Sequence, residues 1–92
     1  PATELHRLGL IEQVLPRAAL ADAALELARE IAAKSPLAVR EAKRAFAVVE
    51  SMPYRDAYRF EQTITEALSH SDDAREAQRA FVEKRKPVFK GR

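Results

Sequence analysis

Apolar side chains recur every three or four residues through most of the chain, which is the spacing of an amphipathic helix. Leu20, Leu27 and Ile31 mark one such stripe, and charged residues occupy the opposite side. This pattern predicts a helix over about residues 18–34.

Three further helices are predicted from their start signals. Ser35 followed by Pro36 is typical of a helix N-terminus, because serine caps free N–H groups and proline tolerates the first position. This second helix extends to about residue 50. Pro53 opens a third, and Ser71 caps a fourth, which has two aspartates in its first turn and fades near Lys86. The apolar stripes of these three helices are Val39, Ala42, Ala45, Phe46 and Val49, then Ala57, Phe60, Ile64, Ala67 and Leu68, then Ala74, Ala77, Phe81 and Val82.

The first 16 residues show a different pattern. Gly9, the apolar residues from Leu10 to Leu15, and Pro16 predict the end of a helix followed by a short strand. A lone strand leaves its backbone N–H and C=O groups unpaired, so either no strand forms or its sheet belongs to residues outside this sequence. The predicted fold class is all-α, with about four helices and a short N-terminal strand-like piece.

Large apolar side chains are few. Apolar residues make up 47% of the 92 positions, but 18 of them are alanines. A domain of this size buries about 60–65% of the surface of its unfolded chain. With so many alanines, we expect a thin core that depends on a partner surface. No apolar run approaches the roughly 18 residues that cross a bilayer, and we expect no membrane contact.

Residue types that carry most enzyme chemistry are also scarce. The chain has no cysteine, and His6 and His70 have no second ligand three or four positions away, so we expect no metal site. It has no glycine-rich phosphate loop and no Gly-x-Ser-x-Gly turn, and we predict no catalytic residue. Glu61, beside an apolar stripe, is interpreted as interfacial. Other carboxylates are expected to form helical ion pairs: Glu26–Arg29, Glu41–Arg44, and Asp72–Arg75 or Glu76–Arg79.

Positive charge is concentrated at the C-terminus. Residues 79–92 carry six basic residues against one glutamate, a charge of +5, whereas the rest of the chain carries −3. Such clusters attract phosphates. Phe81 and Lys84, three positions apart, are spaced to stack a base and hold a phosphate on one helical face. Spacing alone favours the alternative, in which Phe81 is a core residue and the cations are solvated.

Four segments share a familiar order and spacing: GLIEQVLP at residues 9–16, AAKSPLA at 32–38 with Lys43 beyond it, SDDARE at 71–76, and FVEKRKPVFKGR at 81–92. Together they resemble the C-terminal portion of the enoyl-CoA hydratase/isomerase (crotonase) family. The resemblance covers essentially the whole chain. Two positions depart from it, because Ala77 stands where the family usually has glycine and Leu5 where it usually has a small residue.

The resemblance implies a division of the chain. Residues 1–16 would be the end of a catalytic core, and residues 17–92 a C-terminal helical domain for oligomerisation and for covering coenzyme A. It implies an enoyl-CoA hydratase-like enzyme that adds water to, or removes it from, an acyl-CoA thioester substrate, with no tightly bound cofactor. Phe81 and Lys84 would contact the adenine and a phosphate of coenzyme A.

The expected partners are the catalytic core of the same protein and further copies in a trimer or a dimer of trimers. The segment alone is expected to be inactive. Isomerase and carnitinyl-CoA dehydratase-like activities remain alternatives, the latter on the Ser51-Met52-Pro53-Tyr54 start of the third helix.

Two readings outside this family also remain. One is a basic helical module that binds nucleic acid, although the leading interpretation expects none, and the other is a purely structural helical domain. The start at Pro1 is expected to reflect processing or excision from a longer chain, which leaves targeting signals undetermined. We expect a cytoplasmic, bacterial protein.

Overall fold

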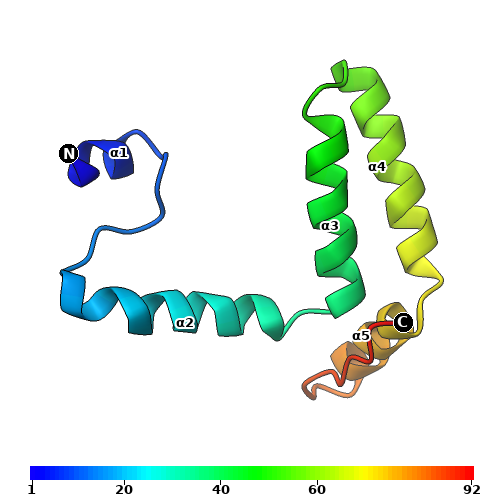
Figure 1. The fold of residues 1–92 in the computed structure, drawn as a ribbon. Helices are drawn as coiled ribbons and strands as arrows, with labels where there is room; N and C mark the ends of the chain where they lie inside the picture. Colours follow the sequence, from blue (N-terminus) through cyan, green and yellow to red (C-terminus); the bar gives the residue numbers. More distant parts are fainter. The chain divides into compact units, whose positions relative to one another are not determined.

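Five α-helices and one 3-10 turn make up the regular structure of the chain. The computed structural model describes residues 1–92 and contains no strand, which confirms the all-α prediction. The elements, drawn in Figure 1, are α1 (Ala2–Arg7), η1 (Arg17–Ala19), α2 (Leu20–Ala32), α3 (Pro36–Val49), α4 (Tyr54–Ser69) and α5 (Asp72–Val82).

The predicted start signals are confirmed. The Ser35 hydroxyl caps α3 by accepting the Ala38 N–H at 3.3 Å, and the Ser71 hydroxyl caps α5 by accepting the Ala74 N–H at 3.1 Å. Pro36 takes the first position of α3, where a missing N–H costs no hydrogen bond. These local signals work because each satisfies backbone groups that a helix end leaves free.

The predicted strand-like piece is wrong. Residues 10–16 form bends and irregular backbone, since no second strand is available to accept and donate their hydrogen bonds. Gly9, at φ +76, ends α1 in a Schellman turn, in which the Gly9 N–H donates to the His6 carbonyl and the Leu10 N–H to the Leu5 carbonyl, both at 2.9 Å. Half-buried Leu15 lines a small hollow with Leu20.

The chain divides into two compact units, residues 1–30 and residues 31–92. The first holds α1, η1 and most of α2. In the second, α3 and α4 lie side by side as an antiparallel hairpin, and α5 lies at the end where α3 begins and α4 ends (Figure 1). This second unit contains every residue of the candidate site.

The thin core is confirmed. Ile64 of α4, at 8% exposure, and Ala80 of α5, at 1%, are the only buried apolar residues. The Arg44 guanidinium of α3 lies 6.0 Å from the centre of the Phe60 ring of α4 and helps join the hairpin. No helix combines the length and the apolar character that a membrane crossing requires.

Candidate functional site

The turn that ends α5, residues 80–85, has an unusual backbone. The Lys84 N–H donates to the Phe81 carbonyl at 3.2 Å and the Arg85 N–H to the Ala80 carbonyl at 3.0 Å, which is again a Schellman turn. Lys84 takes the left-handed position, at φ +53, and is the only non-glycine residue with a positive φ. Gly9 fills the equivalent position after α1, so here a lysine does what a glycine does elsewhere in the chain.

Phe81 and Lys84, the two residues predicted to form a ligand site, lie on this turn and are both exposed. Phe81 is 85% exposed, so it is not a core residue of this chain. The predicted helix to about Lys86 is wrong, because α5 ends at Val82 and Lys84 lies beyond it. The structure therefore joins the two residues through a backbone turn, in which the Lys84 N–H donates to the Phe81 carbonyl, rather than placing both on one helical face.

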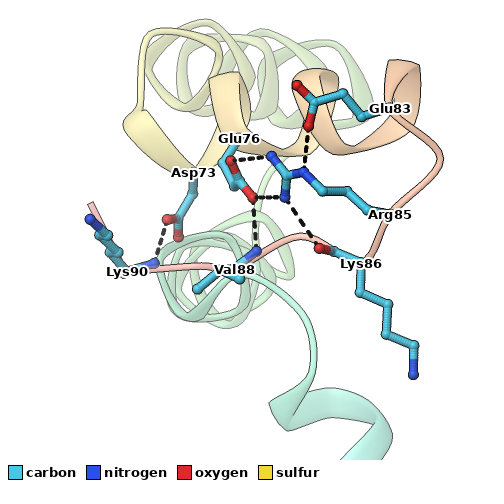
Figure 2. Close-up of polar contacts among 7 residues, drawn as sticks. All are labelled: Asp73, Glu76, Glu83, Arg85, Lys86, Val88 and Lys90. Atoms are coloured by element: carbon cyan, nitrogen blue, oxygen red, sulfur yellow. Dashed lines mark hydrogen bonds and ion pairs between the residues drawn. The ribbon is translucent and has the colours of Figure 1, made fainter.

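Arg85 clamps the turn to α5, as Figure 2 shows. Its guanidinium donates to both carboxylate oxygens of Glu76, from Nη1 at 2.5 Å and Nη2 at 3.1 Å, and from Nε to Glu83 at 2.5 Å. Nη1 also reaches the Lys86 carbonyl at 3.3 Å. Glu76 in turn accepts the Val88 N–H at 3.0 Å, so one carboxylate holds both the turn and the segment that follows it.

Asp73 holds the last residues of the chain. It is 3% exposed, and its carboxylate accepts the Ser35 hydroxyl at 2.6 Å and the N–H groups of Lys90 at 2.8 Å and Gly91 at 3.0 Å. Its own N–H, free at the start of α5, donates to the Arg92 carbonyl at 2.8 Å. Residues 86–92, which we call the C-terminal strap, are thereby tied to the starts of α3 and α5.

These contacts lower the pKa of both carboxyl groups. The hydrogen bonds from the Arg85 side chain, and then from the Val88 N–H, lower the pKa of Glu76 from 4.5 to about 2. The Ser35 hydroxyl lowers the pKa of Asp73, with help from the N–H groups of Lys90 and Gly91, against the opposing effect of burial. Both groups are therefore ionised at neutral pH.

The predicted ion pairs are met in part. Glu41–Arg44 and Asp72–Arg75 form at 2.6 and 2.9 Å, whereas no Glu26–Arg29 pair forms and Glu76 pairs with Arg85 instead of Arg79. Spacing rules could not find the Glu76–Arg85 pair, because its nine-residue separation is bridged only by the turn. The sequence predicted only that Asp73 lies in the first turn of a helix, and no sequence pattern indicated the three hydrogen bonds that its carboxylate accepts.

An apolar groove lies along the α3–α4 hairpin. It has a volume of about 390 Å³. Phe46, Tyr54 and Tyr58 line it and are 74%, 87% and 57% exposed. Glu61 lies in the same lining, and its interpretation as interfacial stays a prediction. No group of three or more His, Cys, Asp or Glu residues is placed to hold a metal ion.

These features define an all-α segment that ends in a clamped, basic turn with an exposed aromatic ring. The chain belongs to the enoyl-CoA hydratase/isomerase family, whose family model matches residues 1–92, and it corresponds to the C-terminal portion of that family. The family resemblance seen in the sequence is thus confirmed.

Named relatives include a carnitinyl-CoA dehydratase from Citrobacter koseri, which is 37% identical over 99% of this chain and 36% of its own length. The enoyl-CoA hydratase EchA19 from Mycobacterium tuberculosis is 42% identical over 99% of this chain and 34% of its own length. The chain therefore spans about a third of the length of the relatives that it matches.

Solved structures agree. The chain superimposes on an enoyl-CoA hydratase/isomerase from Mycobacterium paratuberculosis with a TM-score of 0.91 and 34% identity, covering 99% of this chain and 36% of that one. An enoyl-CoA hydratase from Bacillus anthracis gives a TM-score of 0.91 at 36% identity, covering 99% of this chain and 35% of that one. The helical arrangement is that of crotonase-fold enzymes.

Proposed function

We propose that this chain is the C-terminal helical part of an enoyl-CoA hydratase-like enzyme and contributes to oligomerisation and to coenzyme A binding. The whole protein would add water to, or remove it from, an acyl-CoA thioester in the bacterial cytoplasm. Residues 1–16 would belong to its catalytic core and residues 17–92 to its helical domain. The relatives' names support this reaction class.

The observation that carries the coenzyme A proposal is the exposed pair on the α5 turn. Phe81 offers an open ring face to adenine, and the Lys84 ammonium enters none of the chain's ion pairs. An aromatic ring and a free cation are the groups that stack a base and hold a phosphate. Catalytic groups would come from the core, so the segment alone would not turn over an enoyl-CoA.

Lys84→Ala in the complete protein tests this role. The change is expected to weaken coenzyme A binding by about 1–2 kcal/mol, or roughly 5- to 30-fold, because one charge-assisted hydrogen bond to a phosphate is lost. Titration calorimetry with coenzyme A measures it. Lys43→Ala, a cation of α3 outside the turn, serves as the control, and an unchanged affinity for Lys84→Ala would remove Lys84 from the site.

A dehydratase activity is the second candidate, favoured by the 37% identity to a carnitinyl-CoA dehydratase. Comparing turnover of a short enoyl-CoA with turnover of carnitinyl-CoA by the complete protein separates the two. Preferential turnover of carnitinyl-CoA would assign the dehydratase activity, while the proposed role of Phe81 and Lys84 would stay the same because both substrates carry coenzyme A.

A further inference from the structure

Lys84 stands in a backbone conformation that its side chain disfavours. The left-handed region brings the Cβ of an L-residue close to its carbonyl oxygen, and a non-glycine residue persists there only when its surroundings hold it. The turn after α1 has the same hydrogen-bond pattern and uses Gly9. Something beyond the pattern itself must therefore stabilise the lysine-containing turn.

The surroundings that hold Lys84 are the residues on either side of it. Glu83 and Arg85 bind each other through the guanidinium Nε, so the turn is closed across Lys84. Arg85 is then fixed to the body of α5 by its two bonds to Glu76, whose side chain is only 18% exposed. Figure 2 shows these carboxylates converging on the one guanidinium.

Four of the five N–H groups of Arg85 already donate to the protein itself. Its Nε, Nη1 and Nη2 atoms all donate to protein oxygens, and its side chain is 37% exposed. Lys84, in contrast, has no ion-pair partner. On this turn, the Lys84 ammonium therefore remains available to an anionic ligand, whereas the Arg85 guanidinium holds the conformation of the turn.

We propose that Glu76 and Arg85 are positioning residues, which hold the α5 turn so that Phe81 and Lys84 present a preformed surface to coenzyme A. The inference rests on the proposed function of Phe81 and Lys84. Preformation matters because a turn that is already ordered loses less conformational freedom when the ligand binds. Neither Glu76 nor Arg85 touches the ligand.

Glu76→Gln distinguishes positioning from simple charge effects, because the two predict opposite signs. Removing a carboxylate from a basic surface should tighten the binding of an anion if only the electrostatic field matters. If Glu76 positions the turn, the amide weakens the grip on Arg85, and coenzyme A binding falls about five- to tenfold. Asp72→Asn is the matched control, since it removes a carboxylate from α5 that does not contact Arg85.

The experiment is titration calorimetry of the complete protein with coenzyme A. Glu76→Gln, Asp72→Asn and Lys84→Ala are measured singly, and Glu76→Gln is also combined with Lys84→Ala. Because Glu76 acts through the turn, its effect should shrink once Lys84 is alanine, leaving only the part that passes through Phe81. Arg85→Lys keeps the positive charge but loses the bidentate contact with Glu76, and it should also weaken coenzyme A binding. This variant replaces Glu76→Gln as the test if Glu76→Gln lowers the helical circular dichroism signal.

The outcomes separate the two proposals. If Lys84→Ala weakens binding while both Glu76→Gln and Arg85→Lys bind as tightly as the unaltered protein, positioning is overturned and the coenzyme A contact stands. If Lys84→Ala has no effect, the contact itself fails, and the positioning role fails with it. An equal loss for Glu76→Gln with and without Lys84 would overturn the positioning of Lys84, because none of the effect would pass through that residue.

Discussion

Asp73 is the one charged side chain that the chain buries, and both of its carboxylate oxygens accept hydrogen bonds. Its carboxylate accepts one hydroxyl and two backbone N–H groups, and a buried carboxylate is tolerated when its oxygens are satisfied in this way. Position helps as well, because Asp73 lies in the first turn of α5, where the helix dipole favours negative charge. A single residue thus joins α3, α5 and the C-terminal strap.

Acid is expected to destabilise the chain through Asp73 and Glu76. Both pKa values lie below their ordinary values in the folded protein, so the stabilisation is present above the ordinary pKa and is lost as pH falls through the folded pKa. For Glu76 this window runs from 4.5 down to about 2. Urea unfolding of the complete protein at pH 7, 4 and 3 measures the loss.

Two amide variants, Glu76→Gln as the test and Glu66→Gln as its control, check whether Glu76 causes the loss of stability in acid. Glu76→Gln should unfold at lower urea than the unaltered protein at pH 7, and the gap should narrow as pH falls, because the amide does not titrate. Glu66→Gln removes a carboxylate that enters no ion pair and should keep the full pH dependence. A gap for Glu76→Gln that stays constant from pH 7 to pH 3 would contradict the assignment.

Helix starts were predictable and the end of α5 was not, for a physical reason. Ser35, Pro36 and Ser71 act on backbone groups within three residues, so their meaning is contained in the local sequence. The end of α5 depends on Glu76 reaching Arg85 nine positions away, and lysine is no signal for a left-handed residue. Residues 10–16 failed as a strand because the β-pattern says nothing of whether a partner strand exists.

Lys84→Gly should stabilise the end of α5. An L-residue in the left-handed region destabilises the folded state by roughly 1–2 kcal/mol, and glycine avoids this cost. Glycine also makes the unfolded chain more flexible, which lowers the free energy of unfolding by about 0.4–1 kcal/mol. A net increase of about 0.5–1 kcal/mol in the free energy of unfolding is expected from urea denaturation of the complete protein. Lys84→Ala keeps the Cβ and should give no such increase.

The same variant should bind coenzyme A more weakly, since the ammonium is gone. Higher stability with lower affinity would mean that the strained lysine is kept for binding, which is the usual pattern of strain at functional sites. Lower stability for Lys84→Gly would show that the lysine side chain itself supports the turn.

The chain as a whole has a very small hydrophobic core. Ile64 and Ala80 are its only buried apolar residues, while Phe46 of the stripe predicted on α3 is 74% exposed along the groove. The sequence allowed this prediction, because alanine-rich stripes are too small to fill the space between helices. What covers the stripes was not readable from 92 residues, and the proposed catalytic core and neighbouring subunits are the surfaces that would bury them.

Phe46→Glu tests whether this groove is covered in the complete protein. Phe46 is 74% exposed in the chain by itself, so a charge there costs little unless another surface packs over the ring. If the groove is an assembly surface, the carboxylate loses its water on assembly, and sedimentation velocity should show a smaller species than the unaltered protein. Ala47→Glu adds the same charge one position along α3, at an exposed residue outside the groove lining, and should leave the assembly intact. Equal sedimentation of Phe46→Glu and Ala47→Glu, with unchanged thermal unfolding, would mean that the α3–α4 groove stays open to solvent in the assembled protein.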